Sequence, residues 1–203
     1  VSYARELGYA IKHLGIARKS LSGVELRVHP TLVPEQCLIA GVNDVSNAVM
    51  VNADSVGTTL FYGPGAGSEP TASAVIADIV DVARTMDSYP DSWVPPLGIP
   101  SQSLQSLSIM NIENVETGFY IRFSALDKPG VLSTVTTIMG DAGISIEAII
   151  QREQPAGESY VNVIILTNVT KEKYLDEAVK HIEELDTVRG YVNFIRVEYL
   201  DQA

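Results

Sequence analysis

The spacing of hydrophobic residues changes several times along this chain, from a helical period to a two-residue alternation and back. In the first 86 residues these changes predict a helix over 1–19, strands over 23–29, 46–52 and 57–62, a helical or irregular stretch near 38–43, and a helix over 71–86. The first helix rests on apolar side chains at helical spacing, namely Tyr3, Leu7, Ala10, Ile11 and Leu14.

The strand that begins near residue 23 has two chemically different faces. Its residues alternate, with Val24, Leu26 and Val28 on one face and Glu25, Arg27 and His29 on the other. This alternation is typical of a half-buried sheet. Because His29 is a lone histidine at a strand end, we interpret it as a hydrogen-bonding sheet residue rather than a catalytic base.

The last third of the chain returns to alternation in a different order. We predict a strand over 119–126, a helix over 131–142 ended by Gly143, strands over 144–153 and 160–168 joined by a turn at 154–157, a helix over 171–185 capped by Thr170, and a strand over 191–200. The order βαββαβ is the ferredoxin-like pattern, with two helices on one face of an antiparallel sheet. The predicted fold class is therefore α+β, a mixed α/β segment followed by a ferredoxin-like domain.

A proline-rich stretch separates these two parts. Residues 87–105 hold four prolines and show no usable periodicity. We therefore divide the chain into residues 1–86, a linker over 87–117 and a second domain over 118–203. Trp93 is expected to anchor the linker on a neighbouring surface.

Composition excludes several functional classes. A net charge of −11 argues against nucleic-acid binding and against an anionic membrane surface. The chain has no apolar run that would span a membrane and no signal peptide. A single cysteine, Cys37, rules out an internal disulfide framework and points to the cytosol, and we expect it to be a buried structural thiol. No paired His or Cys ligands exist, so no metal site is expected.

A glycine-rich turn precedes the helix over 71–86. Gly63, Gly65 and Gly67 fall within five residues, and Pro70 and Thr71 open the helix. Such a turn leaves N–H groups and a positive dipole end that suit an anion or a polar cofactor. The spacing GxGxG differs from the dinucleotide fingerprint GxGxxG. A tight strand-to-helix turn without a ligand remains an equal alternative on these grounds.

The surroundings of this turn carry a family resemblance. Four motifs follow one another: LGYAIKHLGIA (7–17), VELRVHPTLVP (24–34), NAVMVNADSVGTTLFYGPGAG (47–67) and PTASAVIADIVDVAR (70–84). Residues 1–86 thereby resemble the C-terminal portion of homoserine dehydrogenases. The resemblance implies hydride transfer between NAD(P) and L-homoserine or L-aspartate 4-semialdehyde, on the route to threonine and methionine. It also implies that Gly65, Ala66 and Gly67 help to enclose the nicotinamide end of the cofactor.

The same resemblance implies that part of the enzyme lies elsewhere. The Rossmann domain and the catalytic lysines of the family precede the matched region, and Lys12 does not sit at a catalytic position. We therefore assign no catalytic residue and expect this chain alone to lack turnover and tight cofactor binding. Helices over 1–19 and 71–86 should expose apolar surface. The choice between NAD and NADP stays open.

The second domain resembles the ACT domain, a small-molecule-binding regulatory module. The resemblance covers residues 118–200 and is carried by DKPGVLSTVTTIMGDAGISIEAIIQ (127–151). In that family an amino acid binds between this loop and a strand of a partner ACT domain. The effector residues implied are Asp127, Pro129, Gly130, Val131, Leu132, Ile144, Ser145 and Gln151.

For a homoserine dehydrogenase the implied effector is L-threonine, with a homo-oligomer formed through the ACT and catalytic-domain sheets. Two other readings stay open. One is a free-standing amino-acid sensor, and the other is an ACT pair used only for dimerisation.

Overall fold

The computed structural model describes residues 1–20, 22–86, 94–95, 97–151 and 158–200. The described residues within Val1–Gln36 and Ser108–Gln202 form one compact unit, and those within Cys37–Leu107 form a second. Residues 1–36 thus pack with the C-terminal unit, although the sequence groups them with residues 37–86. The limits 1–86, 87–117 and 118–203 remain a proposal. Trp93 and the predicted turn at 154–157 lie outside the described residues.

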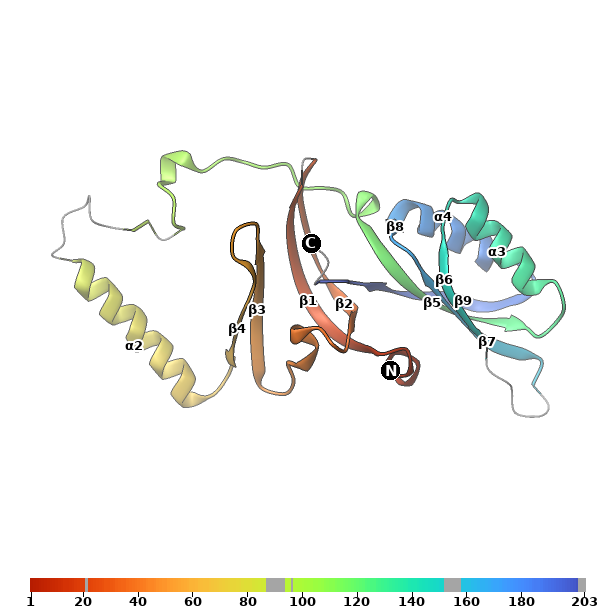
Figure 1. Ribbon diagram of the computed structural model, residues 1–203, viewed down its shortest axis with the longest axis horizontal. Coiled ribbons are helices and arrows are strands. Elements are labelled where there is room, and N and C mark those ends of the chain that lie inside the picture. The colour runs from red at the N-terminus through yellow and green to blue at the C-terminus, as the bar shows by residue number, and fades with distance from the viewer. Residues whose placement is uncertain (21, 87–93, 96, 152–157, 201–203) are drawn as a thin grey trace. The chain divides into compact units, whose positions relative to one another are not determined.

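The predicted βαββαβ order is confirmed in the first unit. Its elements are β5 (Glu116–Leu126), α3 (Val131–Asp141), β6 (Ile146–Gln151), β7 (Tyr160–Thr167), α4 (Glu172–Glu183) and β9 (Val188–Val197). The strands lie in the order β9-β5-β7-β6, and each neighbouring pair is antiparallel. Helices α3 and α4 cover one face of this sheet (Figure 1).

Apolar side chains from both helices and from the sheet fill the core beneath them. Phe119, Phe123, Met139, Ile165 and Leu175 are all at most 2% exposed. Gly143, with φ +73°, follows the end of α3, as the helical stop signal predicts. The cap predicted at Thr170 is wrong. Thr170 pairs with β5 as part of β8 (Thr170–Lys171), so α4 begins at Glu172 without a side-chain cap.

The predicted helix over 1–19 is also wrong. Only α1 (Ser2–Glu6) is helical, and β1 (Tyr9–Ser20) follows it after Gly8, whose φ is +79°. Strand β1 pairs antiparallel with β2 (Gly23–Pro34), from Tyr9 opposite Pro34 to Ser20 opposite Gly23. This long hairpin outweighs the local helical spacing, because strand pairing depends on distant residues.

The hairpin joins the same sheet, since β2 runs parallel to the end of β9 at Thr31 and Leu32. Leu32 is fully buried there, within an apolar cluster on the sheet that also includes Ala4, Tyr120, Ile164, Leu166 and Val197. Residues 108–110 run beside the start of β2, where the Val24 N–H donates to Ser108 O and the Met110 N–H donates to Val24 O. A short 3-10 helix, η4 (Ile112–Asn114), leads from there into β5.

The second unit holds a separate two-stranded sheet. The 3-10 helix η1 (Leu38–Gly41) is followed by β3 (Ser46–Ala53) and β4 (Gly57–Pro64), which pair antiparallel. Helix α2 (Ser68–Thr85) comes next, and the short 3-10 helix η3 (Ser101–Ser103) comes later. These elements confirm both predicted strands and the predicted helix. The expected apolar surface on that helix is present, because α2 has no buried residue and exposes Val75, Ile76, Ile79, Val80 and Val82. None of the helices in the described part of the chain is long and apolar enough to cross a membrane.

Candidate functional site

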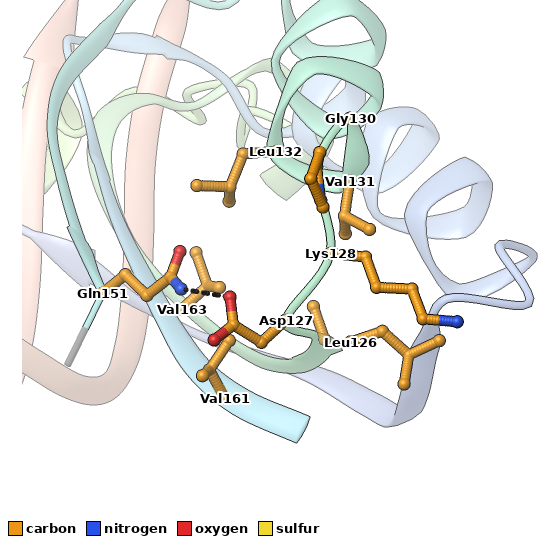
Figure 2. Close-up of a pocket in the computed structure, with 11 residues that line it drawn as sticks. Leu126, Asp127, Lys128, Gly130, Val131, Leu132, Gln151, Val161 and Val163 are labelled. Carbon is orange, nitrogen blue, oxygen red and sulfur yellow. Dashed lines mark hydrogen bonds between the residues drawn. The ribbon is translucent and has the colours of Figure 1, made fainter. Parts of the chain in front are cut away.

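A pocket lies where β5 ends and α3 begins. Its volume is about 170 Å³, and it is lined by residues 125–132, by Gln151 of β6 and by Val161 and Val163 of β7 (Figure 2). The loop between the strand and the helix forms one wall, and the neighbouring strands form the other. Concave sites with a few polar groups between a helix start and a sheet are where proteins bind small molecules.

Polar groups are few in this pocket and are placed at one side. The Gln151 amide Nε2 donates to Asp127 Oδ1 at 3.1 Å, which joins β6 to the loop, whereas the ammonium of Lys128 points away from this pair (Figure 2). Gly130 is the N-cap of α3 in the left-handed region, with φ +93° and no side-chain cap. The start of α3 therefore keeps backbone N–H groups that suit a carboxylate.

The pocket brings together most of the residues predicted to hold an effector. Asp127, Pro129, Gly130, Val131, Leu132 and Gln151 line it. Ile144 and Ser145 do not, because Ile144 packs into the core at 4% exposure and the Ser145 Oγ accepts a hydrogen bond from Asn168 Nδ2 at 2.9 Å. Val161 and Val163 were missed. They reach the pocket only because β7 pairs between β5 and β6. The role of all these residues remains a proposal.

The glycine turn lies exposed between β4 and α2. The Gly65 N–H donates to Val45 O at 3.0 Å, and Gly67 O accepts from the Thr71 N–H at 3.1 Å. Gly67, with φ +129°, is the N-cap of α2, again without a side-chain cap. The three predicted cofactor residues Gly65, Ala66 and Gly67 are all solvent-exposed at this helix start. The geometry therefore leaves room for a ligand to approach the backbone.

A cluster of buried charges that the sequence did not predict lies on β2. Glu25, Arg27, His29 and Thr31 are buried, whereas Leu26 and Val28 on the opposite face are 51% and 71% exposed. The polar face of the alternating strand is thus the one covered by the rest of this unit. The cluster also includes Arg18 of β1, Thr117 of β5 and Glu198, which follows β9.

Arg27 is the centre of this cluster. Its Nε donates a hydrogen bond to Glu25. Its Nη2 forms an ion pair with Glu198, although the angles do not meet those of a hydrogen bond between the described residues. Arg18 adds a second cation, with its Nη2 3.1 Å from Glu198 Oε2 and its Nη1 3.7 Å from Glu25 Oε2. The two carboxylates thus face two guanidinium groups, as buried charges require.

His29 lies at the edge of the same cluster. Arg27 Nη1 is 3.1 Å from His29 Nε2, and because a guanidinium can only donate, Nε2 must accept and the proton lies on Nδ1. Nδ1 in turn is 3.1 Å from Pro30 O and 3.0 Å from Thr31 Oγ1. Burial lowers the pKa of His29, and the positive charges of Arg196 and Arg27 lower it further. The ring therefore hydrogen-bonds within the sheet, as the sequence indicated, and its burial favours the neutral form.

Two expectations about chemistry concern metals and the thiol. No three His, Cys, Asp or Glu side chains gather in the described ranges so as to hold a metal ion. Cys37 is buried at 5% exposure, which agrees with a structural thiol. Lys12 lies on β1 rather than on the predicted helix.

Comparison with known families resolves what the two parts are. The family model described as "Homoserine dehydrogenase" matches residues 1–80, and the model described as "ACT domain" matches residues 119–187. The first part therefore matches the homoserine dehydrogenase family, and the second part matches the ACT domain. The α+β fold class predicted from the pattern agrees with both matches.

Relatives extend the match over nearly the whole chain. A homoserine dehydrogenase of Pseudomonas aeruginosa is 51% identical over 201 residues, which are 99% of this chain and 46% of that protein. One of Neisseria gonorrhoeae is 44% identical over 98% of this chain and 46% of that protein. The crystal structure of a homoserine dehydrogenase from Thiobacillus denitrificans superimposes with a TM-score of 0.89 and 51% identity, over 98% of this chain and 44% of that one. The chain thus spans about half the length of the homoserine dehydrogenases it matches.

Proposed function

We propose that this chain is the C-terminal part of an NAD(P)-dependent homoserine dehydrogenase, which interconverts L-homoserine and L-aspartate 4-semialdehyde. The observation that carries the proposal is the 51% identity with the Pseudomonas aeruginosa enzyme over 99% of this chain. The match covers nearly the whole chain, and so both the family segment and the ACT domain, which favours one enzyme over a separate sensor. A cytosolic location is part of the same proposal.

The glycine turn has the features expected of a segment that contributes to a cofactor site. Gly65, Ala66 and Gly67 are exposed beside a helix start without a side-chain cap. Glycine backbones allow close approach, and the helix dipole favours a polar or anionic group. When bound, the nicotinamide accepts or delivers the hydride. The role of this turn is to cover that end of the cofactor and to exclude water from it.

The enzymatic part is tested by comparing two proteins. The protein of full family length should reduce NAD⁺ or NADP⁺ in the presence of L-homoserine, followed at the absorbance of the reduced nicotinamide. The 203-residue chain alone should show no turnover and no tight cofactor binding. Absence of homoserine-dependent reduction by the longer protein contradicts the proposed activity. Turnover by the 203-residue chain contradicts the proposal that this part alone is inactive.

The ACT pocket supports binding of an amino-acid effector, and L-threonine is our candidate. The uncapped start of α3 beside Gly130 suits the effector's carboxylate, and Asp127 suits its ammonium. Gln151 already bonds to Asp127 and is placed to meet a hydroxyl. Regulation further requires that the effector bind one of two enzyme states more tightly, with a typical coupling of about 1–3 kcal/mol.

Isothermal titration of this chain with L-threonine tests the effector, with L-isoleucine and L-methionine as comparisons. Saturable heat with threonine alone supports a feedback sensor that works without the catalytic part. No heat with any of the three amino acids instead supports an ACT domain that serves only dimerisation, or an effector site that forms only together with the rest of the enzyme.

Dimerisation has one observation in its favour. Strand β6 is an edge of the sheet in the described chain, and an open edge can pair with a second copy. We therefore include a homo-oligomer in the proposal. Light scattering of this chain, with and without threonine, measures its mass directly, and a strict monomer at high concentration contradicts pairing through this edge.

A further inference from the structure

Asn47 on β3 lies against the glycine turn. In the β3–β4 register Asn47 is opposite Gly63, so that Gly65 is its diagonal neighbour on the same face. A Cβ added at Gly65 would lie 1.6 Å from Asn47 Nδ2 and 2.4 Å from Asn47 Cγ, whereas a Cβ added at Gly63 meets nothing within 4 Å. The side chain of Asn47 therefore leans along the hairpin and occupies the space that a side chain at residue 65 would need.

The two residues also share one acceptor. Val45 O accepts the Gly65 N–H at 3.0 Å and faces Asn47 Nδ2 at 3.4 Å. Nearby, the Tyr62 hydroxyl donates to Ser46 Oγ at 2.8 Å, which links the same two strands again. The start of the turn is therefore fastened to the start of β3 by backbone and side-chain contacts together.

Two glycines of the turn are required for different reasons. Gly67 has φ +129°, a backbone conformation that side-chain-bearing residues rarely adopt. Gly65 is not among the glycines with positive φ, so its backbone is open to any residue. At residue 65 the amide of Asn47 occupies the space of a Cβ, so a side chain there requires this amide to move. Backbone conformation therefore favours glycine at residue 67, and the neighbouring Asn47 favours it at residue 65.

We propose that Asn47 is a positioning residue for the cofactor turn, acting through Gly65. Its side chain is solvent-exposed, so it adds little to a core, yet it fixes the path of the backbone that leads to the N–H groups at the start of α2. The functional part of this inference rests on the proposed role of Gly65–Gly67 at the nicotinamide.

A double-variant cycle tests the contact. Gly65→Ala should raise the cofactor KM of the full-length enzyme about tenfold with a smaller change in kcat, because a neighbouring pair of this kind couples by roughly that factor. Asn47→Gly opens the space, so Gly65→Ala in the Asn47→Gly background should raise KM by no more than about threefold over Asn47→Gly alone. Gly63→Ala is the matched control and should behave as the wild type.

Amide hydrogen exchange of this 203-residue chain gives the second readout, independent of the cofactor. Exchange at residues 65–67 should speed up in Gly65→Ala and return toward the Asn47→Gly rate in the double variant. Equal effects of Gly65→Ala in both backgrounds, in KM and in exchange, overturn the role of Asn47. Coupled exchange with an unchanged KM in every variant, Gly67→Val included, overturns the cofactor role of the turn and hence the functional part of the inference.

Discussion

Removing Arg27 should destabilise the unit that contains the ACT domain more than any other single charge removal on β2. The Arg27 side chain is 1% exposed and lies between Glu25 and Glu198, whose side chains are 7% and 4% exposed. In wild type two arginines, Arg18 and Arg27, balance these two carboxylates. Arg27→Met keeps most of the volume but leaves one uncompensated buried negative charge.

The magnitude follows from burial. Removing one partner of a buried ion pair costs about 3–5 kcal/mol, because the remaining charge stays desolvated. For a chain of this size, 1 kcal/mol corresponds to roughly 2–4 °C in Tm, so Arg27→Met should lower Tm by roughly 6–20 °C. Arg18 is the matched control, since its side chain is 47% exposed. Arg18→Met should cost about 1 kcal/mol or less.

Thermal and urea unfolding of this chain, followed by circular dichroism, measure both variants. Adding Glu198→Gln to Arg27→Met removes the uncompensated negative charge. The double variant should recover about 1 kcal/mol or more of the free energy of unfolding, since contacting residues couple by that amount. A Tm loss for Arg27→Met that equals that of Arg18→Met refutes the buried-charge reasoning. No recovery in the double variant refutes it equally.

Three further predictions address other parts of the molecule. Because burial lowers the pKa of His29, the unfolded chain binds the proton more readily, and stability should fall as pH drops below about 6.5. Between pH 7.5 and 5.5 the Tm should therefore fall less in His29→Gln than in wild type. An equal fall of Tm in both proteins contradicts this prediction. Gly67→Val should raise the cofactor KM of the full-length enzyme about tenfold or more, since φ +129° strains any side chain. An unchanged KM in steady-state kinetics contradicts the cofactor role of the glycine turn. Asp127→Asn keeps the acceptor for Gln151 but removes the charge, and should weaken threonine binding about tenfold or more in calorimetry; equal affinity excludes an ammonium contact.

Elements held together by local contacts could be predicted from the sequence. Val131–Asp141 is helical because its apolar residues recur with the helical period and Gly143 supplies the stop. The pocket loop is also local, since Asp127 to Leu132 are consecutive. Most of the predicted effector residues therefore lie together.

Features that depend on distant pairing could not be predicted. Tyr9–Ser20 has a helical spacing of apolar residues, yet it is a strand because β2 pairs with its whole length. The burial of Arg27 depends on Glu198, which is 171 positions away in sequence by difference of their numbers. Asn47 reaches Gly65 only through the register of β3 and β4, which no single motif encodes.

The most direct test of the account is one measurement, the initial rate of homoserine oxidation by the full-length enzyme as L-threonine is raised. It compares wild type with Gly130→Asp and Gly130→Asn, two variants that share the strain of φ +93° and differ in charge. We predict turnover in all three, with inhibition by threonine weakened more by Asp than by Asn, because Asp places a like charge beside the effector's carboxylate. Absence of homoserine oxidation, or equal inhibition of all three, contradicts the account.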